Sequence, residues 1–343
     1  MDPDFLDARA GHTWTNFYIW ARMWILLKTP DEALAEAEAG IADILARDPL
    51  NAEALAMRSL IALEQLRQGH ALELANGAVF NKSDSGALRR TLGMILVANG
   101  EYEKGKAELD LSLRQSPRMR PAEYNFIIRA YLAMRETETA LKLLQEQREA
   151  GLENNPTRWM WLIALAQAGR DAEAQEMLPG TFLSWPAANV RWMEIAWKPF
   201  LDPAVVEGFR ADLLRAGVPL WPYGYAAENA ENRLTKEELQ SLLENGFRWT
   251  GATDQMGGPM ENSGWPDGRV RTVFSYLPGM ALDGRWRLVE NEVCIRYPEV
   301  YLGREFCQWM FHDPNSSSPG NPRYVLTEAF GLLKTGLDPM TEE

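Results

Sequence analysis

Cysteine and histidine are scarce in this chain of 343 residues, which contains two cysteines and three histidines. A zinc site needs several such ligands at short, regular spacings. His12, His70 and His312 share no ligand-like spacing with Cys294 and Cys307. The composition therefore predicts no metal site.

Long apolar segments and clusters of positive charge are also missing. The most apolar stretch, residues 17–27, is interrupted by Arg22 and is much shorter than the roughly 20 residues of a membrane-spanning helix. The formal net charge is −13, and no basic stripe suits a phosphate backbone. We therefore expect neither membrane insertion nor nucleic-acid binding.

The chain starts with Met-Asp-Pro-Asp, which lacks the basic and apolar regions of a signal peptide. As written, the sequence predicts a cytoplasmic protein. The alternative is the periplasm, if the chain is a fragment of a membrane-anchored protein.

Motifs that position catalytic groups are absent from the sequence. It has no glycine-rich phosphate loop and no Gly-x-Ser-x-Gly nucleophile elbow. His312-Asp313 precedes a proline and a serine-rich stretch, which is typical of a turn. The glycine-rich residues 257–268 join two expected strands, so they predict a mobile loop or a lid. We expect no enzymatic activity and no cofactor.

The first half contains a two-helix repeat of about 34 residues, the period of tetratricopeptide repeats. Its clearest copy includes Leu92-Gly93, Gly105, Leu109 and Pro117. Residues 1–178 therefore predict an α-solenoid of about five helix hairpins, whose concave face binds another molecule. In the first unit we expect helices over residues 7–28 and 30–47. In the fifth, Gly169 supplies the left-handed turn between the helices.

Tryptophan is frequent in this half. Core packing is its default role, but aromatic side chains also concentrate at interface hot spots. The candidates for partner binding are Trp20, Trp24, Arg129, Trp159 and Trp161. Because the first helix is not polar all round, we expect it to be covered by the connector, a second copy or a subunit of a larger assembly.

Residues 179–232 predict a proline-rich connector. Pro179-Gly180 interrupts the repeat, and one helix is expected over residues 204–215, with Asp202 as its N-cap. Residues 221–232 resemble an extended linker.

Residues 233–343 predict a short helix followed by a small antiparallel β barrel or sandwich. Thr235 and Glu238 form a capping-box pattern at the start of the helix. Side chains alternate with a period of two in the expected strands. These strands cover residues 247–253, 269–277, 284–290, 292–297, 304–311 and 323–332. The whole chain is thus predicted to be an α+β multidomain protein.

Cys294 and Cys307 fall on successive expected strands, so a disulfide between them is geometrically feasible. An oxidising compartment favours the bridge, and cytoplasm favours two buried thiols. An interior ligand site in the β domain has its own candidate lining residues. They are Trp249, Trp286, Arg296 and Trp309.

The helical half, the segment from Phe200-Leu-Asp-Pro to Val218-Pro219 and the β segment Gly284–Tyr297 together resemble a region of bacterial class III adenylate/guanylate cyclases. It is the region that follows their catalytic domain. That domain and its metal-binding aspartates are absent here, so the resemblance implies no cyclase activity. In some such proteins the array follows a membrane span, which implies a periplasmic location and favours the cysteine bridge.

The sequence therefore favours a non-enzymatic scaffold or adaptor that clamps a protein partner in the groove of its repeats. The alternative is a regulatory sensor whose β domain binds a small apolar or aromatic ligand.

Overall fold

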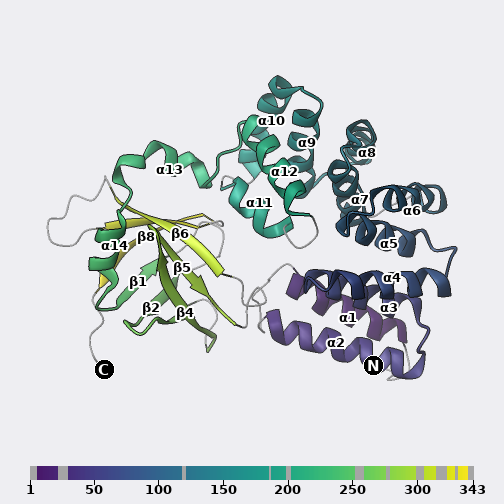
Figure 1. Ribbon diagram of the computed structural model, residues 1–343, viewed down its shortest axis with the longest axis horizontal. Coiled ribbons are helices and arrows are strands. Elements are labelled where there is room, and N and C mark those ends of the chain that lie inside the picture. Colours follow the sequence, from purple (N-terminus) through teal and green to yellow (C-terminus); the bar gives the residue numbers. More distant parts are fainter. Residues whose placement is uncertain are drawn as a thin grey trace. The chain divides into compact units, whose positions relative to one another are not determined.

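The computed structural model describes residues 6–21, 30–117, 121–184, 187–197, 202–251, 259–275, 279–298, 305–313, 323–328 and 331–338. The chain forms two compact units (Figure 1). One comprises Met1–Arg22, Glu32–Trp185 and Met193–Val218, and the other comprises Met23–Asp31, Pro186–Trp192 and Pro219–Glu343. The predicted α+β multidomain class is confirmed, while the division of the chain at residues 178 and 232 stays a prediction.

The helical unit is a row of helix hairpins, as the repeat pattern predicted. The hairpins are α1 (Leu6–Ala21) with α2 (Pro30–Arg47), α3 (Ala52–Glu64) with α4 (Gln68–Asn81), α5 (Gly86–Ala98) with α6 (Tyr102–Gln115), α7 (Pro121–Ala133) with α8 (Thr137–Glu149), and α9 (Asn155–Gln167) with α10 (Asp171–Ser184). None of the described helices is both long and apolar enough to span a bilayer.

The same backbone turn ends the first helix of four hairpins. Leu66, Gly100, Arg135 and Gly169 all have positive φ, between 59° and 77°. The amide of the following residue then bonds a carbonyl one helical turn back, as Arg67 N does to Ala62 O at 2.8 Å. This is the hydrogen bond of a Schellman motif, which satisfies a carbonyl at the helix end. The hairpins therefore share this backbone conformation even where the residue is not glycine.

Two glycines allow the helices of the third hairpin to pack closely. A Cβ added to Gly93 would lie 2.7 Å from Leu109 Cγ and 3.0 Å from the carbonyl oxygen of Gly105. A Cβ added to Gly105 would in turn lie 3.0 Å from the Gly93 carbonyl oxygen. The tight helix contact thus accounts for a glycine in the middle of α5, despite its low helix propensity.

Three expectations for the connector are wrong. Helix α10 continues through Pro179 to Ser184, and a further helix, α11 (Val190–Trp197), was not expected. Residues 221–232 are not extended. They form two 3₁₀ turns, Pro222–Gly224 and Ala230–Asn232, on either side of the short α13 (Tyr225–Glu228).

The expected helix after the repeats is present as α12 (Pro203–Arg215), capped by the Asp202 side chain. Helix α12 packs on α9. The carboxylate of Asp212, which is 3% exposed, accepts hydrogen bonds from Arg135 Nη1 at 2.9 Å, Gln167 Nε2 at 3.2 Å and Arg215 Nη2 at 3.2 Å. A buried charge therefore fixes α12 to the fourth and fifth hairpins.

The second unit contains a closed antiparallel barrel in which each strand pairs with the next and β8 pairs with β1. The strands are β1 (Phe247–Gly251), β2 (Met260–Gly264), β3 (Arg269–Phe274), β4 (Ala281–Val289), β5 (Glu292–Arg296), β6 (Glu305–His312), β7 (Arg323–Glu328) and β8 (Gly331–Asp338). Of the two predicted architectures, the barrel is the one observed. The helix that precedes it, α14 (Lys236–Leu243), has the predicted capping box of Thr235 and Glu238.

Two strand assignments differ from the prediction. Strand β2 lies within residues 257–268, where a mobile loop or lid was expected, and the single segment 323–332 is replaced by β7 and β8. The polar composition of β2 reflects its position. Asn262 is buried and accepts a hydrogen bond from Thr272 Oγ1 at 2.5 Å, and Gly264 leaves room for the ring of Phe247.

The barrel interior is filled by apolar side chains that alternate with outward-facing ones. The core includes Phe247, Trp249, Val293, Ile295 and Met310. Phe247 and Trp249 stack with ring centroids 4.2 Å apart. Because Val293 and Ile295 face the core, Cys294 between them faces outward.

Candidate functional site

The first helices of successive hairpins lie side by side. Helix α3 contacts α5, α5 contacts α7, and α7 contacts α9. Among the described residues, no comparably close contact joins α4 to α6 or α6 to α8. A stack whose first helices converge while its second helices diverge curves toward the first helices. The odd-numbered helices therefore form the inner face of the array.

Polar side chains occur at matching places in the first helices of two hairpins. Arg90 of α5 and Asn125 of α7 lie at the same distance before the left-handed residues Gly100 and Arg135. Arg90 is 4% exposed and spans two hairpins, because it donates to Ser112 Oγ and to Glu123 Oε1, both at 3.1 Å. The ion pair with Glu123 connects α5 directly to α7.

Asn125 joins α7 to the next hairpin through a second polar group. Its Nδ2 donates to Asn154 Oδ1 at 3.1 Å, and its Oδ1 accepts from Thr157 Oγ1 at 3.2 Å. Asn154 and Thr157 also form the capping box of α9. Half-buried Phe126 lies beside Asn125 and packs against the cluster that contains Met94.

The residues proposed for partner binding are mostly not surface groups. Trp159 is 1% exposed and Trp161 is 7% exposed, and the guanidinium of Arg148 covers Trp161 at 4.2 Å from the ring centroid. Arg129 is 9% exposed and lies 5.2 Å from the ring centroid of Phe126. Core packing, the default role, therefore applies to both tryptophans. The side chain of Trp20 and the whole of Trp24 lie outside the described residues.

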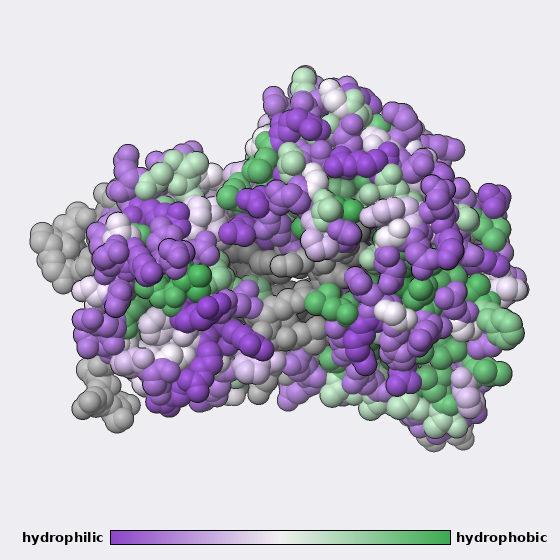
Figure 2. Space-filling model, viewed as in Figure 1, coloured by the Kyte–Doolittle hydropathy of each residue, from purple (hydrophilic) through white to green (hydrophobic). Residues whose placement is uncertain are grey.

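An exposed apolar pair on the helical unit was not predicted. Phe80 at the end of α4 is 87% exposed, and Leu50 before α3 is 67% exposed. The two segments are linked because Asn81 Nδ2 donates to Leu50 O at 3.0 Å. Figure 2 shows hydrophobic surface over this part of the helical unit. The sequence does contain a signal, since Phe80 lies off the face of α4 that buries Ala71, Ala75 and Ala78.

The four residues proposed to line a ligand site in the barrel do not share one interior. Trp249 lies in the core and half-buried Trp286 packs against it. Arg296 is exposed, because it alternates with core residue Ile295. Trp309 packs outside the barrel, with its ring 5.2 Å from that of Trp221. Arg296 and Trp309 therefore lie outside the barrel core, and the ligand site itself stays a prediction.

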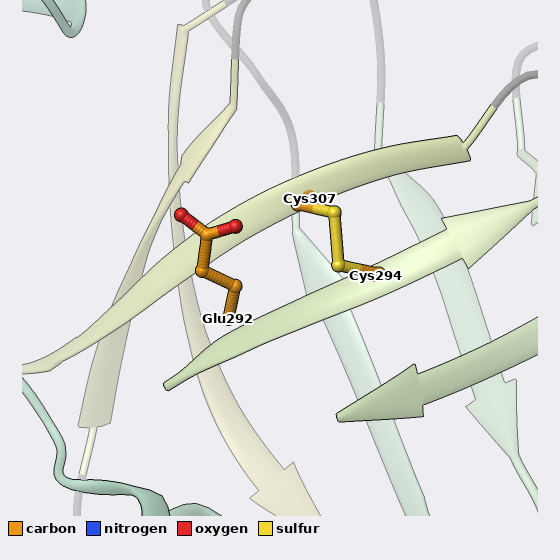
Figure 3. Close-up of side chains that lie close together, drawn as sticks. All are labelled: Glu292, Cys294 and Cys307. Atoms are coloured by element: carbon orange, nitrogen blue, oxygen red, sulfur yellow. A yellow bond between two sulfur atoms is a disulfide. The ribbon is translucent and has the colours of Figure 1, made fainter. Parts of the chain in front are cut away.

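Cys294 of β5 and Cys307 of β6 lie directly opposite each other and are joined by a disulfide. Glu292, two residues before Cys294, has its carboxylate on the same side of the strands, as Figure 3 shows. One oxygen of Glu292 and the two sulfur atoms all lie within 4.8 Å of one another. A carboxylate and two sulfur atoms thus meet on the outward-facing side of β5 and β6, where Cys294 is fully buried and Glu292 and Cys307 are half-buried.

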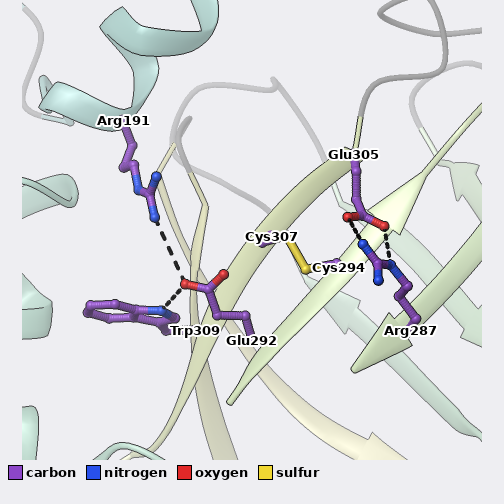
Figure 4. The surroundings of a disulfide bond; sticks show 7 residues. All are labelled: Arg191, Arg287, Glu292, Cys294, Glu305, Cys307 and Trp309. Carbon is purple, nitrogen blue, oxygen red and sulfur yellow. Dashed lines mark hydrogen bonds and ion pairs between the residues drawn. A yellow bond between two sulfur atoms is a disulfide. The ribbon is translucent and has the colours of Figure 1, made fainter. Parts of the chain in front are cut away.

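Polar and charged side chains flank this cluster on both sides (Figure 4). Trp309 Nε1 donates to Glu292 Oε1 at 2.6 Å, and Arg191 Nη2 lies 3.9 Å from the same oxygen. On the other side Arg287 binds both oxygens of Glu305, at 2.7 and 2.6 Å. This bidentate pair lowers the pKa of Glu305 and raises that of Arg287.

A second cation lies on the Trp309 ring. The guanidinium of Arg233 is 3.5 Å from the ring centroid, and its Nη2 donates to Asn291 Oδ1 at 2.6 Å. Burial lowers the pKa of Arg233, while the charge of Glu292 acts in the opposite direction. Trp309 is therefore held between a cation, an indole ring and the carboxylate that it binds.

Comparison with known proteins finds similar solved structures but no family. No family model and no curated protein matches the chain. Five chains of solved structures match, and three of them are each 15% identical in sequence to this chain. YrrB, described as a tetratricopeptide protein with an unusual peptide-binding site, covers 51% of this chain and 86% of its own, with a TM-score of 0.36. PilF of Pseudomonas aeruginosa covers 65% and 98%, with a TM-score of 0.43. The Naa15/Naa10 complex with HypK covers 68% and 36%, with a TM-score of 0.35.

These likenesses carry no argument about function, and none of the three structures is described as a cyclase. The link to cyclases therefore stays a prediction.

Proposed function

We propose that this chain is a non-enzymatic protein-interaction scaffold or adaptor, and that the inner face of α3, α5 and α7 binds a segment of its partner. The observation that carries the proposal is the side-by-side packing of these first helices. Such packing presents one continuous face to a peptide or a helix. Half-buried Phe126 supplies an apolar anchor on that face, next to Asn125, whose side chain is bonded to Asn154 and Thr157.

The test compares two apolar-to-acidic substitutions in the full chain. Phe126→Glu alters the inner face, and Phe80→Glu alters the exposed apolar pair of Leu50 and Phe80, which belongs to the second hairpin. The intact protein and both variants are used for affinity capture from native host extract, after circular dichroism has shown that the helices are intact. We expect a stoichiometric partner with the intact protein and Phe80→Glu, and its loss with Phe126→Glu. A partner retained by Phe126→Glu and lost with Phe80→Glu contradicts the inner-face site.

A second candidate function is a sensor whose barrel binds a small ligand. Two buried donors support it, because Trp249 Nε1 and Gln308 Nε2 have no hydrogen-bond partner among the described residues. Buried donors without acceptors cost free energy, so an acceptor on a ligand would stabilise the barrel. Thermal-shift screening of small carboxylates and carbonyl compounds tests this. A stabilising compound must lose its effect in Trp249→Phe and Gln308→Leu.

The compartment is also a proposal. The sequence as written favours the cytoplasm, whereas the Cys294–Cys307 disulfide supports the periplasmic alternative. Self-association or membership of a larger assembly is proposed for the tryptophan-rich N-terminal end.

A further inference from the structure

The cluster of Glu292, Cys294 and Cys307 has the composition of a metal site when its disulfide is open. Glu292 and Cys294 lie on one face of β5, and Cys307 lies opposite Cys294 on β6. Three ligand atoms, one from each residue, are within 4.8 Å of one another (Figure 3). Two ligands of one tetrahedral zinc ion, each bound at about 2.0–2.3 Å, lie roughly 3.5 Å apart, which is farther than two bonded sulfur atoms. Once the disulfide is open, the two cysteine side chains must therefore rotate apart to place the three atoms around one ion.

The carboxylate of Glu292 is already oriented for this role. Trp309 Nε1 donates a hydrogen bond to Glu292 Oε1 at 2.6 Å, and the other carboxylate oxygen, Oε2, takes no part in this bond. Hydrogen bonds of this kind orient the ligands of protein metal sites. Trp309 is in turn fixed by the Trp221 ring and the guanidinium of Arg233.

The charges also suit a divalent cation. Two thiolates and one carboxylate carry three negative charges, and a divalent ion leaves one of them uncompensated. Arg191, whose Nη2 lies 3.9 Å from Glu292 Oε1, supplies the remaining positive charge. Arg287 is on the same outer face but is occupied by Glu305.

We propose that reduction of the Cys294–Cys307 disulfide creates a binding site for a thiophilic divalent cation, best fitted by Zn²⁺, on the outer face of the barrel. The two thiolates and the Glu292 carboxylate are three ligands, and a water molecule is the fourth. Thiolate ligands select zinc over magnesium or calcium, which prefer oxygen. The site goes beyond the scaffold function, because it uses no residue of the helical array.

The reduction needs a dithiol of the thioredoxin class as its electron donor. A thiolate of the donor attacks the sulfur of half-buried Cys307, the S–S bond breaks, and Cys294 leaves as a thiolate. The second thiol of the donor then attacks the mixed disulfide, which releases Cys307 and leaves the donor oxidised by two electrons. Binding of Zn²⁺ displaces the thiol protons to solvent, so that disulfide and metal exclude each other.

The test is a metal titration of the full chain in two redox states. Protein reduced with a phosphine, which is then removed, is titrated with Zn²⁺ against a chromophoric chelator, and the oxidised protein is titrated in parallel. Co²⁺ serves as a spectroscopic probe, because a thiolate-to-metal charge-transfer band reports sulfur ligation. We expect one ion bound per reduced chain, with sulfur ligation, and no comparable binding to the oxidised chain.

Three variants locate the site. The Cys294→Ser/Cys307→Ser double variant should lose the charge-transfer band and the tight binding. Glu292→Gln removes a direct ligand, and Trp309→Phe removes the bond that orients it, so each should weaken zinc binding about 10-fold or more. Glu305→Gln is the matched control, because the Glu305 carboxylate lies near the cluster but binds Arg287. The zinc affinity of this variant should equal that of the intact protein.

Several results overturn the proposal. They are the absence of one-to-one binding to the reduced chain, binding that survives loss of both cysteines, and an affinity that Glu292→Gln leaves unchanged. Loss of the near-ultraviolet circular dichroism of the barrel on reduction also overturns it, because the site requires β5 and β6 to stay paired.

Discussion

Replacing Asp212 by asparagine should weaken the attachment of α12 to the helical array and so destabilise the helical unit. The carboxylate is 3% exposed and accepts hydrogen bonds from Arg135, Gln167 and Arg215. Asparagine keeps the shape but loses the charge, and its amide places donors opposite donors. The substitution therefore removes favourable contacts and adds an unfavourable one.

The size of the effect follows from the exposure of the partners. Removing one member of a buried ion pair costs about 3–5 kcal/mol, because the other charge stays buried without a partner. Here the side chains of Arg135 and Arg215 are 55% and 47% exposed, so water can solvate them once the carboxylate is gone. We therefore expect a loss of about 2–3 kcal/mol in the unfolding free energy of the helical unit, below the full cost of a buried pair.

The assay is urea unfolding of the full chain followed by far-ultraviolet circular dichroism, which is dominated by the helical unit. Asp171→Asn is the matched control. Asp171 also binds Arg215, at 3.0 Å, but its side chain is 37% exposed, so its loss should cost less than about 1 kcal/mol. Equal effects of the two substitutions, or a change below about 0.5 kcal/mol for Asp212→Asn, would refute the argument from burial.

Three further predictions concern the backbone, the packing and the charges. Leu66→Gly should stabilise the array by up to about 1 kcal/mol in thermal unfolding, because Leu66 is 58% exposed and has φ of 60°; a clear loss of stability contradicts this. Gly93→Ala should lower the unfolding free energy by about 1–2 kcal/mol, since its Cβ would overlap Leu109, and an increase would show that the contact relaxes freely. The pKa of Glu305 is lower in the folded protein than in the unfolded chain, where it is about 4.3. The ion pair with Arg287 therefore stabilises the barrel fully above the unfolded pKa, and this stabilisation is lost as the pH falls through the folded pKa. When the stability of the barrel is measured against falling pH, Glu305→Gln should therefore lose less stability than the intact protein. The difference should be below about 1 kcal/mol, because the ion pair is exposed. Identical stability curves for the two proteins would contradict this prediction.

The helical repeat could be predicted because its signals are local. Small residues at 93 and 105 and the turn at Gly169 follow from helix packing and backbone conformation. The same turn at Leu66 and Arg135 could not be predicted, because neither residue favours positive φ on its own. At both positions the hydrogen bond that ends the helix, from Arg67 N to Ala62 O or from Glu136 N to Tyr131 O, accompanies the conformation that glycine adopts without strain.

Strand β2 escaped prediction for a different reason. Met260–Gly264 has a polar composition, and its place in the sheet depends on partners distant in the chain, Thr272 for Asn262 and Phe247 for Gly264. Cross-strand contacts of this kind leave no periodic pattern in a single segment.

The outward positions of Arg296 and Trp309 were partly within reach of the sequence. Period-two alternation in β5 already places Arg296 on the face of Cys294, opposite the apolar Val293 and Ile295. For Trp309 the alternation is ambiguous, because β6 carries apolar residues on both faces. The outer face of β6 is covered by Trp221 and Tyr225, which lie far earlier in the chain.

The pairing of β8 with β1 has a consequence for how the barrel can be connected to other chains. Arg248 lies opposite Asp338, so the first and last strands of the barrel are neighbours. A short linker between these ends would permit new termini at a turn elsewhere, for example at Glu290-Asn291 between β4 and β5. For the same reason the barrel is suited to insertion as a module into a loop of another protein, where both junctions meet the host at one point.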